Sequence, residues 1–407
     1  MEKYSSPDSM QSFALHGDGH SHPEYAHLMP IFATSTFTFE SAEQGTARFS
    51  GEEPGFVYSR FGNPTLSAAE EMLAGMEGFG LSDEKGKPLQ LHARLHASGQ
   101  GALATLLLSV LRPGDTVLSH SSVYGGTFEM IFQFLPNFGI NAIATDFDDA
   151  DKLKQLIATT KNVKLIHLET PANPLLSCID LEVVCAIAAE HGIKVSVDNT
   201  FATPYLQQPF RFGADFVFHS TTKFLNGHGN AIGGVLIGKD ANWMKQQAYQ
   251  AYKLLGACPS AFDAFLVMNG AKTLPLRMEK HCENAEKVAA FLADHPKVEK
   301  VHYNGLSSHP GYAITQKQMR RPGAVLSFEL DGGMTAAINF INRLQLCTRA
   351  VSLGTVDTLL SHPASMSHSG VSKADREKAG ITDGLIRMSV GLECVEDIIN
   401  DLQQALG

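Results

Sequence analysis

The chain has 407 residues, of which 44% are apolar and 18% are charged, and 32 Lys and Arg against 42 Asp and Glu give a net charge of −10. This acidic balance argues against a nucleic-acid binder, which usually needs a basic face. The longest apolar stretch, 102–111, is about half of the roughly 20 residues that span a bilayer, and the N-terminus lacks the apolar core of a signal peptide.

Residues 1–63 have no clear periodicity, and we expect an extended arm that lies on a neighbouring subunit. The four histidines of this segment are His16, His20, His22 and His27. The triplet from His20 to His22 has neither cysteine partners nor helical spacing, so we expect no metal site there.

Residues 64–257 alternate between short apolar runs and helical patterns, which predicts an α/β domain with a mainly parallel sheet. A helix is expected where Leu181, Val184, Cys185 and Ala188 share one face. In such sheets, ligands bind at the carboxyl ends of the strands. The predicted strands are 116–119, 164–168, 194–197, 215–219 and 234–237.

The sequence pattern changes over residues 258–407, where it predicts a smaller α+β domain. A helix is expected over 280–293 and an alternating strand over 324–330, with Ala324, Leu326, Phe328 and Leu330 on one face. A polar insert at 81–94 reads as a surface loop or hairpin. The six cysteines form no CxxC pair, which is typical of reduced thiols in a cytoplasmic protein.

Small residues precede the helical run 101–111, and Gly99 and Gln100 stand at its start. Backbone N–H groups at a helix start can bind a phosphate, although such a segment is often only a tight turn. Asp198 ends the β-branched run of its strand. Its carboxylate is either an ordinary loop or capping group or the partner of a protonated pyridine nitrogen.

Lys223 carries the most specific local pattern. It follows the strand end at His219 and two hydroxyl residues, Ser220 and Thr222 being close by. Most lysines are solvated surface charges, but one at a strand end beside phosphate-binding hydroxyls is suited to a Schiff base. The glycines after it do not match G-x-G-x-x-G, which disfavours a nicotinamide site.

Arg387 lies in an alternating strand opposite Ile386 and Met388, where a guanidinium can bind a carboxylate in bidentate fashion; an ordinary surface arginine is the alternative. Tyr124 can stack on a flat cofactor or belong to the core. A phosphate cup, an acid, a Schiff-base lysine and a carboxylate clamp together indicate pyridoxal 5′-phosphate and an amino-acid substrate.

At these residues the chain resembles the Cys/Met-metabolism family of pyridoxal-phosphate enzymes, almost from end to end. The resemblance implies a fold of aminotransferase type (fold type I). The motifs that carry it are YSRFGNPT (58–65), SGQGA (98–102), VYGGTFE (123–129), ETPANP (169–174), VDNTFATPYLQ (197–207), HSTTKFLNGHG (219–229), KTLPLRMEKHCENA (272–285), AVSLG (350–354), HPASMSHS (362–369) and IRMSVGLE (386–393).

The family resemblance implies a role for each matching residue. Lys223 would bind the cofactor as a Schiff base, Asp198 would pair with the pyridine nitrogen, and Tyr124 would stack on the ring and assist proton transfer. The other implied cofactor contacts are Gly99, Gln100, Thr200, Ser220 and Thr222, with Tyr58 and Arg60 from a neighbouring subunit.

For the substrate, the resemblance implies that Arg387 and Ser352 bind the carboxylate and that Asn173 lies near the ring oxygen of the cofactor. Members of the family are usually homotetramers, built as a dimer of dimers with shared active sites. The implied reaction begins with loss of the Cα and Cβ protons and departure of a γ-substituent. Hydrolysis then makes the enzyme a lyase, whereas capture of a new nucleophile makes it a transferase.

The motifs KTLPLRMEKHCENA, AVSLG and HPASMSHS are most similar to those of methionine γ-lyase, which forms 2-oxobutanoate and ammonia. Val351 stands where cystathionine γ-lyases typically carry Glu. Gly126 replaces the Cys usual in methionine γ-lyases, and Lys253 lies near the place where those enzymes carry an acidic residue. The alternatives are an O-acetyl- or O-succinyl-homoserine sulfhydrylase, a cystathionine γ-synthase, a lyase for a non-sulfur γ-substituted amino acid, or a non-catalytic cofactor-binding homologue.

Overall fold

The computed structural model describes residues 9–19, 22–120, 122–366, 369, 372–378 and 380–407. Its larger sheet has seven strands in the order β1-β7-β6-β5-β4-β2-β3, and all neighbours are parallel except those that involve β7. These strands are β1 (His92–His96), β2 (Thr116–Ser119), β3 (Asn141–Ala144), β4 (Val163–Glu169), β5 (Lys194–Asp198), β6 (Phe216–His219) and β7 (Gly234–Gly238).

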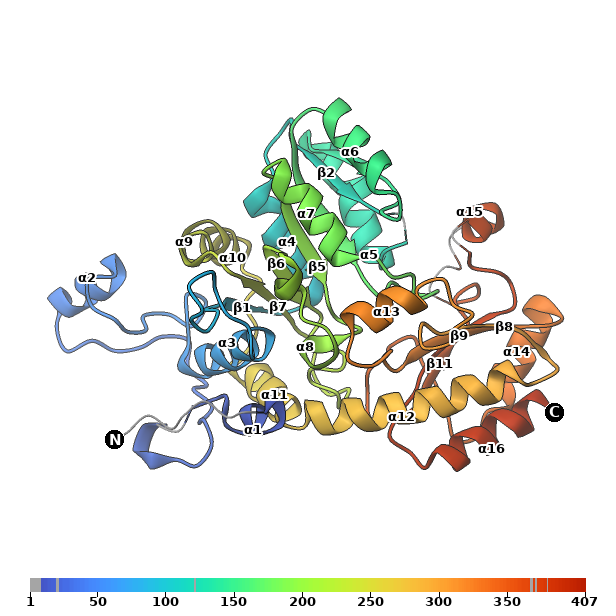
Figure 1. Cartoon of the computed structure of the whole chain (residues 1–407). Helices are drawn as coiled ribbons and strands as arrows, with labels where there is room; N and C mark the ends of the chain where they lie inside the picture. The colour runs from blue at the N-terminus through green and yellow to red at the C-terminus, as the bar shows by residue number, and fades with distance from the viewer. Residues whose placement is uncertain (1–8, 20–21, 121, 367–368, 370–371, 379) are drawn as a thin grey trace.

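Both faces of this sheet are buried, because successive residues of its strands contribute to different apolar clusters. Leu118 and Ile166 pack with helices α6 (Ala150–Thr159) and α7 (Leu181–Glu190) on one face. Val117 and Leu165 pack with α4 (Gly99–Val110) on the other (Figure 1). A parallel sheet covered in this way leaves its strand ends as the accessible edges.

The smaller sheet has five strands in the order β10-β11-β12-β9-β8, and only β10 and β11 are parallel. The long helix α12 (Leu274–Ala293) packs against it together with α14 (Gly333–Arg343) and α16 (Val395–Leu406) (Figure 1). The strands are β8 (Val298–His302), β9 (Val325–Leu330), β10 (Thr348–Arg349), β11 (Leu359–Ser361) and β12 (Leu385–Ser389).

The remaining helices connect the sheets or precede them. Buried residues of α3, α11, α12 and β9 belong to one apolar cluster, so the core is continuous between the two sheets. These helices are α1 (Met10–His16), α2 (Ala42–Ser50), α3 (Pro64–Glu77), α5 (Gly125–Phe128), α8 (Thr203–Leu206), α9 (Ala241–Trp243), α10 (Tyr249–Leu255), α11 (Ala261–Lys272), α13 (Tyr312–Gln318) and α15 (Lys373–Lys378).

The mainly parallel sheet is confirmed. Strand β9 forms where the alternation predicts it, but Val325 and Ser327 on its second face are buried as well. The hydroxyl of Ser327 donates to the carbonyl of Pro174 at 2.7 Å, so a loop from the larger sheet covers that face. The insert 81–94 contains a bridge between Ser82 and Pro88, but its last three residues are part of β1.

The segment before α3 contains helices that its weak periodicity did not indicate. Helix α2 lies away from the two sheets (Figure 1) and carries Phe49, which is 66% exposed. Of the two histidines of the H-x-H triplet, His20 lies outside the described residues. Within the described ranges, no three His, Cys, Asp or Glu side chains gather as metal ligands, and no helix is both long and apolar enough to cross a membrane.

Candidate active site

Three polar residues end three neighbouring strands of the larger sheet. Glu169 ends β4 and pairs in register with Asp198, which ends β5; Asp198 in turn lies opposite Phe218 of β6. His219 is the last residue of β6. Because parallel strands end at one edge, the sheet brings these side chains and the loop that follows His219 together.

Lys223 lies in this loop, four residues beyond the end of β6. Its Nζ donates a hydrogen bond to Oγ of Ser352 at 3.0 Å. Burial and the positive charge of Arg387 lower the pKa of Lys223 to about 8. At pH 7 about a tenth of this amine is therefore uncharged, far more than for an ordinary lysine, and the uncharged amine is the nucleophile.

Arg387 projects from β12 of the smaller sheet and faces the same edge. Its Nη2 donates to the carbonyls of Val351 at 2.8 Å and Ser352 at 3.0 Å, and its Nη1 donates to Oδ1 of Asn173 at 3.2 Å. Burial lowers its pKa to about 10, so the guanidinium stays charged. No acidic side chain pairs with it in the described ranges, which leaves it suited to the carboxylate of a ligand.

Asp198 is buried, and its Oδ1 accepts a hydrogen bond from the backbone N–H of Thr200 at 3.0 Å. The hydroxyl of Thr200 accepts in turn from the N–H of Ser220 at 2.9 Å. Burial raises the pKa of Asp198, while the hydrogen bonds from Thr200 and the charge of His219 oppose that rise. Such a carboxyl group is suited to the protonated nitrogen of a bound heterocycle.

Glu169 was not predicted as a site residue, although it opens the ETPANP motif and ends a strand as Asp198 does. Its two carboxylate oxygens accept from the backbone N–H groups of Tyr124 at 2.6 Å and Asn173 at 3.0 Å. Burial and the nearby charge of Asp198 raise the pKa of Glu169 to about 8. It therefore ties together the loops that carry Tyr124 and Asn173.

The start of α4 has backbone N–H groups that are suited to an anion. Ser98 caps the helix by accepting from Gly101, and the N–H groups of Gly99 and Gln100 donate to no acceptor within the described ranges. A Cβ placed on Gly99 would lie 3.1 Å from Cβ of Ser220, so the helix start and the Lys223 loop are adjacent. Free N–H groups and the helix dipole favour a phosphate at this point.

Thr222 and Tyr124 complete the predicted set on the same side of the sheet. The hydroxyl of Thr222 donates to the carbonyl of Gly233 at 3.2 Å and lies 3.0 Å from its N–H. Tyr124 is 54% exposed and directly precedes α5, and its backbone N–H donates to Glu169 at the end of β4. Its ring is free to contact a ligand.

The side chain of Gln100 occupies the space beside Gly126. A Cβ built on Gly126 would lie 2.7 Å from Nε2 of Gln100 and 2.8 Å from Cε1 of Tyr124. Distances below 3.0 Å force a neighbour to move, and Gln100 is the flexible one of the two. Glycine at 126 is therefore matched to glutamine at 100.

Two of the predicted residues, Tyr58 and Arg60, do not contribute to the site around Lys223 in the described part of this chain. Nη1 of Arg60 donates to the carbonyl of Lys253 at 2.7 Å, at the end of α10. Tyr58 packs edge-on against Phe61 and is 40% exposed. Neither makes a hydrogen bond to the Lys223 pocket within the described part of the chain. Ser367 and His368 of the motif 362–369 lie outside the described residues.

Pyridoxal phosphate fits the residues present. The free N–H groups at the start of α4 suit its phosphate, the buried carboxyl of Asp198 suits its ring nitrogen, and the partly uncharged amine of Lys223 suits its aldehyde. The side chains around this site come from both sheets. Arg387 lies in β12 of the smaller sheet, and Ser352, which bonds Lys223, lies in the segment before β11.

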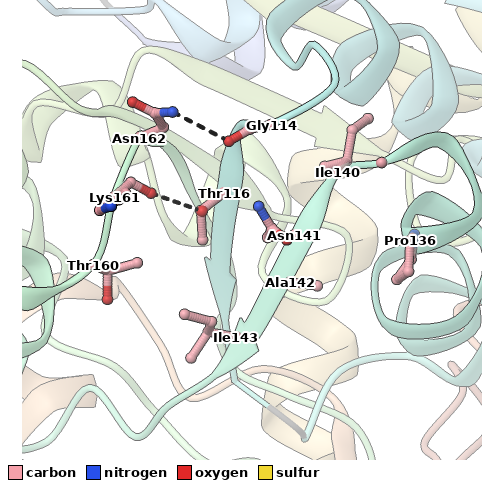
Figure 2. A pocket seen from close by; sticks show the side chains of 11 residues that line it. Gly114, Thr116, Pro136, Ile140, Asn141, Ala142, Ile143, Thr160, Lys161 and Asn162 are labelled. Atoms are coloured by element: carbon pink, nitrogen blue, oxygen red, sulfur yellow. Dashed lines mark hydrogen bonds between the residues drawn. The ribbon is translucent and has the colours of Figure 1, made fainter.

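A cavity of about 640 Å³ lies at the opposite edge of the larger sheet, where β2, β3 and β4 begin (Figure 2). The hydroxyl of Thr116 donates to the carbonyl of Lys161 at 2.9 Å, and Nδ2 of Asn162 donates to the carbonyl of Gly114 at 3.3 Å. None of the predicted site residues lines this cavity. Its volume is sufficient for a small molecule, but the polar groups of its lining already make hydrogen bonds to one another.

The family model described as "Cys/Met metabolism PLP-dependent enzyme" matches residues 11–407. An L-methionine gamma-lyase of Fusobacterium nucleatum subsp. polymorphum is 47% identical over 380 residues, which cover 93% of each chain. An L-methionine gamma-lyase of Porphyromonas gingivalis is 44% identical and covers 97% of this chain and 96% of its own.

Among solved structures, a cystathionine gamma synthase from Xanthomonas oryzae pv. oryzae, in complex with aminoacrylate and cysteine, superposes with a TM-score of 0.89. It is 37% identical, and the superposition covers 98% of both chains. The similarity therefore extends over sequence and fold together, including both sheets and the edge between them.

Proposed function

The chain belongs to the Cys/Met-metabolism family of pyridoxal-phosphate-dependent enzymes, and we propose that its reaction is γ-elimination from a γ-substituted L-amino acid of sulfur metabolism. Methionine γ-lyase chemistry would yield 2-oxobutanoate, ammonia and the leaving group. The extent of identity to L-methionine gamma-lyases supports this choice. Intact Lys223, Asp198 and Arg387 argue against a non-catalytic homologue.

When bound, pyridoxal phosphate supplies an aldehyde that condenses with amines and a ring that accepts electron density. The N–H groups of Gly99 and Gln100, with the hydroxyls of Ser220 and Thr222, would bind its phosphate. Tyr58 and Arg60 of a neighbouring subunit would complete this contact.

The chain's own groups then divide the proton transfers. Lys223 would hold the cofactor through its amine, and the same amine would take the proton from Cα of the substrate; Asp198 would keep a proton on the ring nitrogen. The hydroxyl of Tyr124 would pass a proton to the departing γ-substituent. Arg387 and Ser352 orient the substrate carboxylate, beside Asn173.

The observation that carries this proposal is the environment of Lys223: a half-buried amine with a pKa of about 8, hydrogen-bonded to Ser352 and near an unpaired Arg387. The test is reduction of the purified protein with borohydride, followed by peptide mapping and an assay of 2-oxobutanoate from methionine. A cofactor label on Lys223 and product formation are expected. A label elsewhere, or none, contradicts the proposal.

A second candidate, γ-replacement, is favoured by the contact between Gln100 and Gly126. Methionine γ-lyases usually carry Cys at position 126, and Gln100 here fills the space that a side chain would need. O-acetyl- and O-succinyl-homoserine should be assayed with and without sulfide. Homocysteine formed only with sulfide would identify a sulfhydrylase, whereas 2-oxobutanoate formed regardless of sulfide would identify a lyase. A 2-oxo acid obtained only from oxygen-linked substrates would identify the non-sulfur lyase.

We further propose a cytoplasmic homotetramer, with residues 1–63 as an arm, 64–257 as the cofactor-binding domain and 258–407 as the C-terminal domain. The exposed Phe49 of α2, and the lack of hydrogen bonds between Tyr58 or Arg60 and Lys223 in the described part of the chain, support an arm that reaches a neighbour. The six free cysteines suit a reducing compartment. Mixed refolding of inactive Lys223→Ala and Arg60→Ala chains should restore part of the activity if sites are shared.

A further inference from the structure

Helix α12 carries a buried polar stripe, within the motif KTLPLRMEKHCENA, that the proposed reaction does not use. Its members are Arg277, His281 and Asn284, which are 5%, 0% and 0% exposed. They stand at positions i, i+4 and i+7, so they share one face of the helix. Residues on such a buried face are normally apolar, whereas these three carry hydrogen-bond donors.

Arg277 holds the loop that carries Lys223. Its Nη1 donates to the carbonyl of Phe224 at 2.7 Å, and its Nη2 donates to the carbonyls of Gly270 at 2.7 Å and Leu225 at 3.3 Å. Burial lowers its pKa to about 10, so the guanidinium stays charged. Among the described residues no carboxylate pairs with it, and carbonyl oxygens of this loop and of α11 compensate its charge.

The Lys223 loop is packed closely on two sides. Gly227 has a φ of +74°, and a Cβ at this position would collide with the guanidinium of Arg277. On the other side, a Cβ on Gly354 would lie 2.6 Å from the backbone nitrogen of Phe224. The loop is therefore held between α12 and the segment before β11, and its position depends on both.

His281 and Asn284 connect the same face of α12 to the residues that follow β12. Nδ1 of His281 donates to the carbonyl of Val390 at 2.7 Å, and its ring packs edge-on against Phe224. Nδ2 of Asn284 donates to the carbonyl of Gly391 at 2.9 Å. Nε2 of His281 and Oδ1 of Asn284 have no hydrogen-bond partner in the described part of the chain.

This stripe costs stability, because an apolar face would fill the same space without an unpaired charge or unsatisfied atoms. What it adds is direction, since a hydrogen bond fixes the angle of its acceptor whereas apolar packing tolerates rearrangement. Helix α12 runs from α11 to the smaller sheet (Figure 1). Its acceptors lie beside Lys223 at one end and beyond Arg387 at the other.

We propose that Arg277, His281 and Asn284 are positioning residues that fix the separation between the amine of Lys223 and the guanidinium of Arg387. The proposal rests on the proposed function, in which the substrate amine meets the cofactor held by Lys223 while Arg387 binds the carboxylate. An α-amino acid carries both groups on one carbon, so it reaches both anchors only if their separation is held. A ligand with one of the two groups is insensitive to that separation.

The test compares two ligands in the holoenzyme. L-norleucine has the amine and the carboxylate but no γ leaving group, and hexanoate is the same chain without the amine. The change in cofactor absorbance measures norleucine affinity, and competition with norleucine measures hexanoate affinity. In Arg277→Met the dissociation constant of norleucine should rise roughly tenfold or more, because misplaced reacting groups lose one to two orders of magnitude. That of hexanoate should stay unchanged, since Arg387 keeps its own bonds to Val351 and Asn173.

Arg321→Met is the matched control. Arg321 pairs with Glu279 and Glu286 of α12 at 2.8 and 2.9 Å, but within the described ranges it bonds neither the Lys223 loop nor the residues that follow β12. Its substitution weakens the attachment of α12, so it reproduces any general loss of stability. Both dissociation constants should stay at their wild-type values in this variant.

Arg277→Gln provides the second variant if Arg277→Met does not fold, because its shorter amide keeps a donor but has neither the reach nor the charge of arginine. It should show the same selective loss of norleucine affinity. An equal loss of both affinities, unchanged affinities in a folded Arg277 variant, or a loss of norleucine affinity in Arg321→Met overturns the proposal. A wild type without cofactor absorbance contradicts the proposed function instead.

Discussion

The two edges of the seven-stranded sheet are built from the same strands but differ in how their polar groups are satisfied. At the amino ends, the cavity in Figure 2 is lined by loop groups that bond one another, and its ionisable side chain, Lys161, is exposed. At the carboxyl ends, Glu169 and Arg387 are buried and Lys223 is half-buried, and all three have displaced pKa values. Buried charge without full pairing, rather than cavity volume, distinguishes the edge that we propose as catalytic.

The two edges therefore contribute differently to the stability of the fold. Burying Lys223 and Arg387 without acidic partners costs folding free energy, which a site that must bind a phosphate and a carboxylate recovers when its ligands arrive. The opposite edge bears no such cost, because Asn162 and Thr116 satisfy neighbouring carbonyls. Substitutions at the carboxyl edge should therefore change activity or ligand binding, whereas substitutions at the amino edge should change neither. Four experiments examine that difference.

The largest effect is expected from Lys223→Ala. Without the amine there is neither covalent attachment of the cofactor nor a base at Cα, so kcat/KM should fall about ten-thousand-fold. Product formation and the mass of the borohydride-reduced protein measure both losses. Lys253→Ala, which removes an amine from α10, serves as the control for attachment at 223. Activity retained by Lys223→Ala would remove the distinction between the two edges.

Arg387→Ala should affect substrate binding more than cofactor binding. Loss of a bidentate charged contact of about 3 kcal/mol raises KM roughly a hundredfold, while the cofactor remains attached to Lys223. Steady-state kinetics with the cofactor absorbance recorded in parallel provide the measurement. Arg349→Ala is the control, since that exposed arginine binds only the carbonyls of Ile341 and Asn342. Lost absorbance with an unchanged KM would contradict the carboxylate role.

In the cofactor-free protein, Lys223→Met should increase stability. The pKa of Lys223 is depressed to about 8 in the folded state from 10.5, so the folded protein binds fewer protons and loses stability as the pH falls from above 10 to 8. At pH 7 the variant should be more stable by about 3 kcal/mol, and this advantage should shrink as the pH rises. Urea unfolding of both proteins at pH 7 and pH 10 measures the difference. Equal stability of wild type and variant at pH 7 would mean that the pKa of Lys223 is not lowered in the folded state.

The smallest effect is expected at the cavity of Figure 2. Asn141 and Lys161 have exposed side chains there, and the bond to Thr116 uses the backbone carbonyl of Lys161. Asn141→Ala and Lys161→Ala should change kcat/KM by less than about twofold and stability by less than about 0.5 kcal/mol. A large loss of activity in either variant would show that this edge also serves the reaction.

The sequence predicted well what depends on local pattern. Apolar runs located the five strands from β2 to β7 other than β3, and the residues at their ends included Asp198 and, four residues after β6, Lys223. The motif resemblance added Tyr124, Asn173 and Ser352. The parallel arrangement explains why these separate positions come together, since each strand delivers its last residue to the same edge.

The rest depends on packing between distant segments. Nothing near Glu77 indicates that it bonds His219, because that contact joins the end of a helix to a strand 142 residues later. Strand β9 alternates between apolar and mixed residues, yet the loop at Pro174 buries its second face. Strand β1 was hidden because its first residues are polar and its only sheet neighbour is the antiparallel β7.

The contact between Gln100 and Gly126 also constrains how this enzyme can change. A Cβ at 126 would meet the amide of Gln100 and the ring of Tyr124, so a cysteine there requires the flexible side chain of Gln100 to move aside. Residues 100 and 126 therefore compete for one volume beside Tyr124, and substitutions at the two positions should have non-additive effects on activity.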